Sequence, residues 1–339
     1  MTERFLLIDK YGVFLGKHSE RLRLTQNKQV LAEVPLLDLE HVMVLSGGVA
    51  LSTDALRACA ERGIPVTFLS RSGQVYARLL SAEMGGTVKT RREQLLAYSD
   101  HRGVYLARAF ATGKMKNQSS LLKYMAKYRK ARDQDAFQTA HQAASAIDTL
   151  VEELQQLEGP TVDHLRPLVL SLEGRAAEHY WNAVQRLLPS DVAFSGRETR
   201  GAQDLVNMAL NYGYGVLYSQ VEQAILLAGL DPYAGFIHVD RAGKPSLVLD
   251  LTEEFRQPMV DRTVFALLDK GPRPELDQEG NLTEATRRLL AQRVLERLGG
   301  LVDYQGKKHR LRTVIQSQAH HLATYLRGEG NYKPFLMRW

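Results

Sequence analysis

The first 80 residues alternate short apolar runs with turn residues, which is the pattern of a β-rich domain. Seven runs rich in Val, Leu and Phe are separated by Gly, Asp, Asn or Pro, and this spacing predicts short strands. One segment, 51–63, has a helical period instead, with Ser52 or Thr53 as a possible N-cap and Gly63 as a stop. The predicted strands lie at 4–9, 12–16, 20–25, 28–36, 41–46, 65–70 and 74–80.

After a break at Met84-Gly85-Gly86, the apolar residues recur at helical spacing to near the end of the chain. We therefore predict an α+β multidomain protein, with a small β-rich N-terminal domain (1–86) followed by a larger all-α domain (87–339). A loop is expected at 271–282, and the last ten residues form an irregular tail. The predicted helices lie at 89–130, 135–157, 161–188, 202–230, 246–270, 283–298 and 309–327.

Composition places the chain among ordinary globular proteins and argues against a membrane protein. The sequence has 339 residues and no apolar run of the length that spans a bilayer. Its N-terminus lacks the basic flank and apolar core of a secretory signal. A single cysteine, Cys59, excludes an internal disulfide, and its helical setting predicts a small buried side chain. We expect a cytoplasmic protein.

Charge is concentrated in one segment of the predicted helical domain. The whole chain has a net charge of +6, whereas residues 89–132 hold twelve Lys and Arg against Glu93 and Asp100, a local net charge of +10. The remainder of the chain is therefore net acidic by 4. Such a field favours a polyanionic partner such as nucleic acid. The alternative is a solvated helix face.

A candidate metal site centres on His238, which ends a short apolar run. Ser246 is a predicted N-cap for the segment that follows, and Asp250, Glu253 and Glu254 then fall in its early turns. Residues three and four apart share a helix face, so two or three carboxylates can converge with one imidazole. Mixed N and O ligands suit Mg²⁺ or Mn²⁺. Alternatively, the acidic residues are there because the helix dipole favours them, and the histidine is a surface residue.

A further carboxylate, Glu173, lies among small residues in a predicted helix. Gly174 follows it directly, and Ala176 and Ala177 extend the small-residue surface. A glycine inside a helix costs about 1 kcal/mol relative to alanine, which is tolerated where a backbone or a ligand approaches closely. Glu173 is therefore either a ligand that faces a cleft or a residue at the rim of a helix contact.

These motifs occur in an order that resembles a known family. The ordered set covers nearly the whole chain, and on it the chain resembles the CRISPR-associated adaptation endonuclease/integrase (Cas-one, or Cas1) family. The matching pieces are the β-rich start, KMKNQ (114–118), EGRAAEHYW (173–181), FSGRETRGAQDLVNMALNYGY (194–214), GFIH (235–238), SLVLDLTEEFRQPMVDR (246–262) and the closing YKPFLMRW (332–339).

The resemblance implies a metal-binding catalytic triad of Glu173, His238 and Glu253, which holds Mg²⁺ or Mn²⁺ in the helical domain. The family usually has Asp at the third position, where this chain has Glu253. Asp250 matches another acidic position of the motif, as a ligand or as a support, and Glu254 is its acidic neighbour.

The resemblance also implies the reaction and the partners. A metal-dependent DNA endonuclease/integrase would insert short foreign DNA fragments (spacers) into a CRISPR array by phosphodiester transesterification. The DNA partners would be the double-stranded spacer precursor and the CRISPR repeat. The β-rich domain would serve dimerisation, and the homodimer would join a small ferredoxin-like Cas-two (Cas2) partner in a heterohexameric complex.

Residues with cationic or amide side chains on the basic helix and on the segment 194–214 are candidate DNA contacts. Two rival functions remain: a non-catalytic DNA-binding scaffold, and a helical metallohydrolase for a small phosphorylated substrate. The +10 segment disfavours the metallohydrolase, since a small substrate needs no extended basic face. The candidate DNA-binding residues are Arg91, Arg92, Lys114, Lys116, Asn117, Gln118, Arg197, Asn207 and Tyr214.

Overall fold

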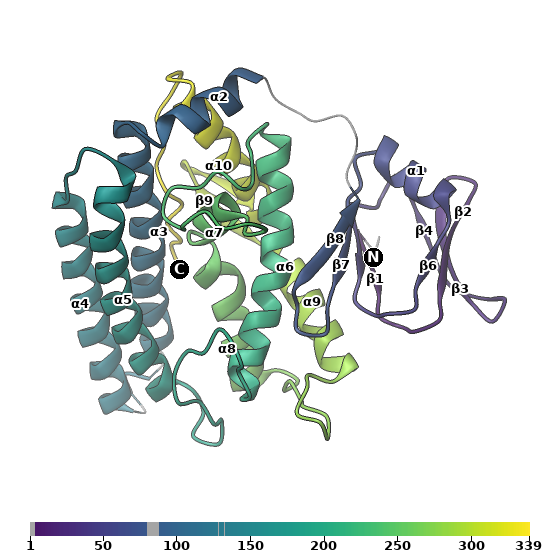
Figure 1. Cartoon of the computed structure of the whole chain (residues 1–339). Helices are drawn as coiled ribbons and strands as arrows, with labels where there is room; N and C mark the ends of the chain where they lie inside the picture. The colour runs from purple at the N-terminus through teal and green to yellow at the C-terminus, as the bar shows by residue number, and fades with distance from the viewer. Residues whose placement is uncertain (1–3, 80–87, 128, 132) are drawn as a thin grey trace.

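The computed structural model describes residues 4–79, 88–127, 129–131 and 133–339, and it has a strand-rich and a helix-rich part (Figure 1). The strand-rich part contains all seven predicted strands and the predicted helix, and it adds the two-residue strand β6. Its elements are β1 (Phe5–Ile8), β2 (Phe14–His18), β3 (Arg21–Gln26), β4 (Gln29–Pro35), β5 (His41–Val44), β6 (Ala50–Leu51), α1 (Thr53–Glu61), β7 (Val66–Leu69) and β8 (Val75–Leu79).

Two four-stranded sheets and α1 enclose the N-terminal core. The strand orders are β1-β5-β7-β8 and β4-β3-β2-β6. Strand β3 follows the period-2 rule, since Leu22 and Leu24 point into the core and the arginines between them do not. Cys59 is fully buried in this core, as predicted, and the Ser52 side chain caps α1 by accepting the Ala55 N–H.

The helix-rich part follows the predicted order, so the α+β prediction is confirmed. None of the described helices is both long and apolar enough to cross a bilayer. The helices are α2 (Val88–Ala97), α3 (His101–Lys127), α4 (Gln134–Gln156), α5 (Val162–Leu187), α6 (Leu205–Leu227), α7 (Ser246–Thr252), a π-helical turn η1 (Arg256–Asp261), α8 (Arg262–Lys270), α9 (Glu284–Leu298) and α10 (Leu311–Leu326).

Three details of the predicted helical part are wrong. The predicted helix at 89–130 is two helices, α2 and α3. A new helix begins after Asp100, because its carboxylate accepts the Arg102 N–H at 2.8 Å. The predicted helix at 246–270 is interrupted before the π-helical turn, which contains Pro258, a residue without a backbone N–H. The part is also not all-α, since β9 (Leu301–Tyr304) and β10 (Lys307–Arg310) form a hairpin. The predicted linker at Met84–Gly86 lies outside the described residues, and the boundary at 86 stays a prediction.

Helix α6 lies between the other helices and the β7–β8 hairpin (Figure 1). The hairpin tip reaches α6 at Gly215, where an added Cβ would lie 1.7 Å from the Gly73 carbonyl oxygen. The glycine inside α6 therefore allows two backbones to touch. Beside this contact Arg78 of β8 forms an ion pair with Glu222 of α6, and both side chains are largely buried.

A buried histidine also connects the two parts. The His41 Nε2 lies 2.9 Å from the Thr67 hydroxyl, and its Nδ1 lies 3.0 Å from the Gln220 side-chain nitrogen on α6. Because the amide nitrogen of Gln220 can only donate, the ring is neutral with its proton on Nε2. Burial, with a smaller contribution from the Arg78 charge, lowers the pKa of His41 to about 3.

Replacing Gly215 with alanine is expected to destabilise the protein by about 1–3 kcal/mol, because the added methyl group overlaps the Gly73 carbonyl. Gly174→Ala is the matched control, since no neighbouring protein atom lies within 4 Å of a Cβ at that helical position. Gly174→Ala should gain up to ~1 kcal/mol from helix propensity. Urea unfolding of both variants measures this, and equal stability of the two would contradict the close contact.

Protein stability is expected to fall on acidification because of His41. The unfolded chain takes up a proton near the ordinary pKa of 6.5, whereas the folded chain resists protonation down to about 3. Stability present above pH 6.5 is therefore lost as the pH falls through this window, with a slope of up to ~1.4 kcal/mol per pH unit. His41→Gln should flatten the slope in urea unfolding, and His179→Gln, at an exposed position, should leave it unchanged.

Candidate active site

The loop between α6 and α7 carries His238, and the Asp250 carboxylate of α7 organises it. Asp250 accepts the backbone N–H groups of Ile237 and His238, each at 3.0 Å, and that of Phe236. The same carboxylate lies 2.7 Å from Nδ1 of the His238 ring. This contact orients the imidazole and directs its Nε2 away from Asp250.

Side chains from distant elements complete the support of this loop. Arg166 of α5 donates to the carbonyls of Ile237 and Phe236, and Gln94 of α2 donates to those of Asp231 and Ala234. The backbone of an irregular segment needs such partners when it is buried. Arg166 and Gln94 therefore hold the segment that presents the histidine.

The prediction that Ser246 is an N-cap is wrong. Ser246 is already the first residue of α7, Pro245 precedes it, and the helix has no side-chain cap. The loop folds back over the start of the helix, so that the Ser246 hydroxyl accepts the Gly235 N–H at 2.9 Å. Gly235 itself lies so close to α7 that a Cβ would be 2.8 Å from an Asp250 carboxylate oxygen.

Two buried carboxylates face each other beside His238. Glu173 of α5 is 9% exposed and Glu253, at the end of α7, is 1% exposed. The Lys114 ammonium of α3 lies between them, 3.0 Å from Glu253 Oε2 and in direct contact with Glu173 Oε1. The His238 Nε2 lies 4.0 Å from Glu253 Oε1. The structure thus brings together the three residues of the predicted triad.

The charges of this cluster depend on one another. Burial alone would raise the pKa of Glu253, but the Arg256, Lys114 and His238 side chains outweigh it and lower that pKa to about 2. Arg256 Nε lies 3.0 Å from Glu253 Oε1. Burial alone would lower the pKa of Lys114, but Glu173 and Glu253 raise it. Glu253 and Lys114 are therefore both charged at neutral pH.

Glu254 points away from this cluster and anchors the C-terminal tail. Its carboxylate accepts the Phe335 N–H at 2.8 Å and the Gln318 amide at 2.7 Å, and the Tyr332 hydroxyl contacts it too. Burial raises the pKa of Glu254 to about 7. Its oxygens are engaged by the tail and by α10, so Glu253 alone of this pair faces Glu173 and His238.

The donors of the cluster fit a hard or borderline divalent ion. Glu173 Oε2 is buried and accepts no hydrogen bond within the described chain, Glu253 Oε2 contacts the Lys114 ammonium, and the His238 Nε2 lies 4.0 Å from Glu253 Oε1. Within the described part of the chain, no three His, Cys, Asp or Glu side chains form a ready-made metal cage. The Lys114 ammonium instead lies between the two glutamates. Asp250 is committed to His238 and to the loop, which favours its role as a support.

Several cations of the basic segment 89–132 form ion pairs in three dimensions. Arg102 pairs with Asp100 and Glu93, Lys123 pairs with Asp148, and Lys89 pairs with Glu329. The local charge of +10 along the sequence is thus partly offset by acidic groups from other elements. Of the predicted DNA contacts here, Arg92 is exposed, and Arg91 and Lys116 are partly buried.

Positive charge gathers instead in a cleft between the β7–β8 hairpin and the helices. The cleft has a volume of about 1140 Å³. Glu222 is the one acidic residue of its lining within the described chain, and Arg78 pairs with it. The cleft adjoins the carboxylate cluster, because Arg256 lines the cleft and contacts Glu253. The other cations that line it are Arg71, Arg197, Arg200, Arg241 and Lys244.

Arg197, a predicted DNA contact, is held rigidly at this cleft. Its guanidinium donates to the side-chain oxygens of Asn207, at 2.9 Å, and Asn211, at 2.6 Å, and lies 5.4 Å from the centre of the Tyr214 ring. Asn207 is fully buried and also binds the backbone of Gly196, so it positions Arg197.

Four predicted DNA contacts, Asn207 among them, are buried, which removes them from a direct DNA interface in this conformation. Tyr214 is 3% exposed and its hydroxyl binds Asp261. Asn117 is 1% exposed, and its amide donates to the Glu254 and Phe335 carbonyls, so it holds the tail. Gln118 is equally buried. Helical spacing identified polar residues but could not show that the tail covers them.

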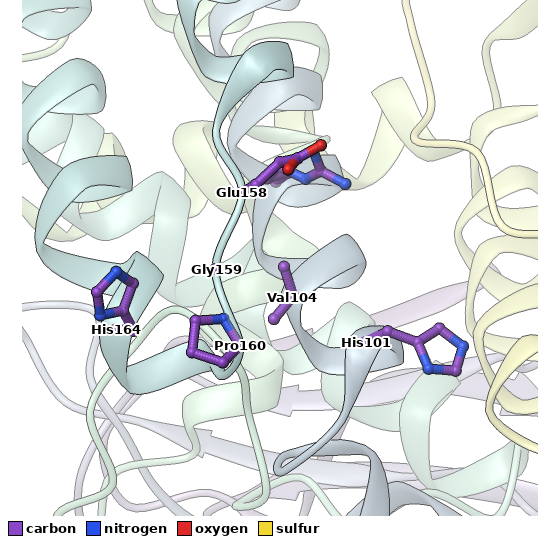
Figure 2. A pocket seen from close by; sticks show the side chains of 7 residues that line it. His101, Val104, Glu158, Gly159, Pro160 and His164 are labelled. Carbon is purple, nitrogen blue, oxygen red and sulfur yellow. The ribbon is translucent and has the colours of Figure 1, made fainter.

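A second hollow, with a volume of about 570 Å³, lies beside the N-terminal end of α3 (Figure 2). His101 and His164 lie on opposite sides of Pro160 in this view, so the two imidazoles do not converge. Arg108 of this hollow donates to the Leu157 carbonyl at 2.8 Å. The hollow therefore offers no second metal site.

Sequence reasoning missed several residues that build the site. Arg166 and Gln94 are far from the loop in sequence, and no local pattern connects them to it. Arg256 follows Glu253 by three residues, a spacing at which a helical ion pair forms, so the sequence could have predicted this pair. The sequence could not predict that Lys114 lies between Glu173 and Glu253, because both partners are distant from it in sequence.

Comparison with known proteins agrees with this geometry. The family model described as CRISPR associated protein Cas1 matches residues 6–296. The CRISPR-associated endonuclease Cas1 1 of Archaeoglobus fulgidus is 38% identical over 345 residues, which cover 98% of this chain and 99% of that protein.

Two solved structures share the fold. A casposase bound to integration product matches with a TM-score of 0.82 at 23% identity, covering 98% of this chain and 93% of that one. A Cas6-RT-Cas1–Cas2 complex matches with a TM-score of 0.76 at 20% identity, covering 99% of this chain and 36% of the other. The chain belongs to the Cas1 family of CRISPR-associated proteins.

Proposed function

We propose that this chain is a metal-dependent DNA endonuclease/integrase that inserts short DNA fragments into a CRISPR array. The observation that carries the proposal is the buried pair Glu173 and Glu253, which share the Lys114 ammonium and lie beside the ring Nε2 of His238. Family membership adds the nuclease/integrase class, since the relative from Archaeoglobus fulgidus is named an endonuclease.

The proposed reaction is attack of a DNA 3′-hydroxyl on a phosphodiester of the target strand. One P–O bond forms while the bond to the 3′ oxygen of the target breaks, and the hydroxyl proton is transferred to that leaving oxygen through solvent. Because one phosphodiester replaces another, no energy source is needed. With water in place of the 3′-hydroxyl, the same geometry yields strand cleavage.

The residues of this chain have separate tasks in that reaction. Glu173, His238 and Glu253 would hold Mg²⁺ or Mn²⁺, which supplies positive charge where the phosphate gains negative charge in the transition state. Asp250 orients the imidazole, and Arg256 braces Glu253 from the cleft side. A mispositioned ligand costs metal affinity, so these contacts support the site.

The cleft cations would hold the DNA. All but Arg78 and Arg256 lack an acidic partner within the described chain, and phosphate oxygens would supply the missing negative charge. This arrangement favours an extended polyanion over a small phosphorylated substrate. A non-catalytic DNA-binding scaffold would need the same cleft, but it gives no reason to bury two facing carboxylates beside a histidine.

The proposed partners are a second copy of the chain and Cas2. The strand-rich part exposes large apolar side chains, as a dimerisation surface requires: Phe14, Val30, Leu31 and Leu37, the last 95% exposed. The matching Cas6-RT-Cas1–Cas2 complex contains a Cas2 partner, and the matching casposase is bound to an integration product. We infer that Cas2 and double-stranded DNA, as spacer precursor and repeat, serve this chain likewise.

Strand transfer tests the proposal. The protein, with and without Cas2, is incubated with a labelled duplex bearing 3′-hydroxyls and a plasmid carrying the repeat, in Mg²⁺, Mn²⁺ or EDTA. Joining should require a divalent ion, and Glu173→Gln and His238→Ala should each reduce it by about 100-fold or more. DNA binding by both variants should survive.

Glu178→Gln is the matched control, since Glu178 is an exposed carboxylate of the same helix as Glu173. It should join DNA at the rate of the unmodified chain. Joining in EDTA would exclude the metal mechanism. Absence of joining and cleavage with every ion, beside intact DNA binding, would favour the scaffold.

Salt dependence distinguishes the cleft from the basic segment as the DNA footprint. Arg241→Ala should weaken duplex binding and reduce the slope of log affinity against log salt by ~0.9 for each lost phosphate contact. Lys123→Ala is the control, because Lys123 lies in the basic segment but pairs with Asp148. Fluorescence anisotropy over a salt series measures both, and a larger effect of Lys123→Ala would move the footprint to the helix.

A further inference from the structure

Lys114 lies where a cation bound by Glu173 and Glu253 would have to lie. Its ammonium is 3.0 Å from Glu253 Oε2 and also contacts Glu173 Oε1, so it bridges carboxylates of two different elements. The side chain is 15% exposed, and its flexible four-carbon stem leads from α3 into the cluster. It is therefore a movable monovalent cation between two candidate ligands.

The two glutamates need a cation between them. Facing carboxylates repel strongly when they are buried, because water does not screen them. Arg256 offsets Glu253 from the side of Oε1, and Lys114 is the cation on the inner side that both carboxylates share. The ammonium thus keeps the two carboxylates facing each other.

The same contact must be given up when a divalent ion binds. An ion held by the inner oxygens of Glu173 and Glu253 would occupy the position of the ammonium, and two cations in contact would repel. The displaced ammonium needs another anion, since the carboxylates that it contacts among the described residues are the two that the ion takes. A DNA phosphate brought to the site supplies such an anion, because Lys binds phosphate as a point charge.

We propose that Lys114 is a positioning residue that holds Glu173 and Glu253 together in place of the metal ion, and that moves to a phosphate of bound DNA when the ion enters. This inference rests on the proposed function, since it requires a metal ion at these carboxylates. Its consequence is thermodynamic. DNA should strengthen metal binding, and the metal should strengthen DNA binding by the same factor.

Binding of Mn²⁺, followed by electron paramagnetic resonance, tests this without any turnover. The probe is Mn²⁺ alone, and then Mn²⁺ with a duplex whose 3′ ends lack the hydroxyl, so that no joining occurs. For the unmodified chain, the duplex should tighten Mn²⁺ binding by about fivefold or more, within the usual range of coupling between sites.

Lys114→Met removes the competing charge and keeps the length of the side chain. This variant should bind Mn²⁺ about fivefold or more tightly than the unmodified chain in the absence of DNA, and the duplex should then add little. Lys123→Met, on the same helix but paired with Asp148, is the control and should behave like the unmodified chain. Lys114→Gln, which keeps a hydrogen-bond donor, repeats the test if the methionine variant fails to fold.

The outcomes separate this inference from the proposed function. Unchanged or weaker Mn²⁺ binding by the folded Lys114 variant, or undiminished coupling to DNA, would overturn the role of Lys114 and leave the metal site intact. Binding that survives Glu173→Gln at full strength, or its absence from every variant, would instead overturn the metal site. Tighter binding with lost coupling would establish the displacement of Lys114.

Discussion

The burial of two like charges against each other is the constraint on which the rest of the structure depends. Glu173 and Glu253 come from different elements, and both are at least nine-tenths buried. Each buried charge is costly unless a partner compensates it. Lys114 from α3 and Arg256 from the turn after α7 supply the compensation. Three separate parts of the chain, α3, α5 and the junction of α7 with η1, must therefore converge before the site exists.

The presentation of His238 shows how an irregular segment becomes a rigid one. A single carboxylate, Asp250, binds three successive backbone N–H groups and the imidazole, so the position of the ring is tied to α7. Arg166 and Gln94 satisfy the carbonyls on the other side of the loop. The histidine ring is thus held in a fixed position although it lies in a loop. A metal ligand requires such a fixed position.

The contact between the strand-rich and helix-rich parts of the molecule forms the basic cleft as well as joining the two parts. The β7–β8 hairpin approaches α6 closely because Gly73 and Gly215 leave room for backbone contact. The cleft beside this contact is lined by residues of both parts, Arg71 from one and Arg256 from the other among them. Docking of the strand-rich part therefore completes the basic surface next to the carboxylates.

The sequence by itself determined the order of the elements and the α+β class, since local periodicity encodes these, and its resemblance to the Cas1 family predicted the triad of Glu173, His238 and Glu253. Only the tertiary structure decided where the charge lies and what each polar side chain touches. Lys114, which reads as a phosphate contact on a basic helix, lies between two glutamates, and Asn117 holds the tail. The +10 segment is partly neutralised by ion pairs, while arginines and a lysine from distant parts of the sequence form the basic cleft. Ion pairing and burial depend on distances in space between residues far apart in sequence, and no pattern along the chain contains them.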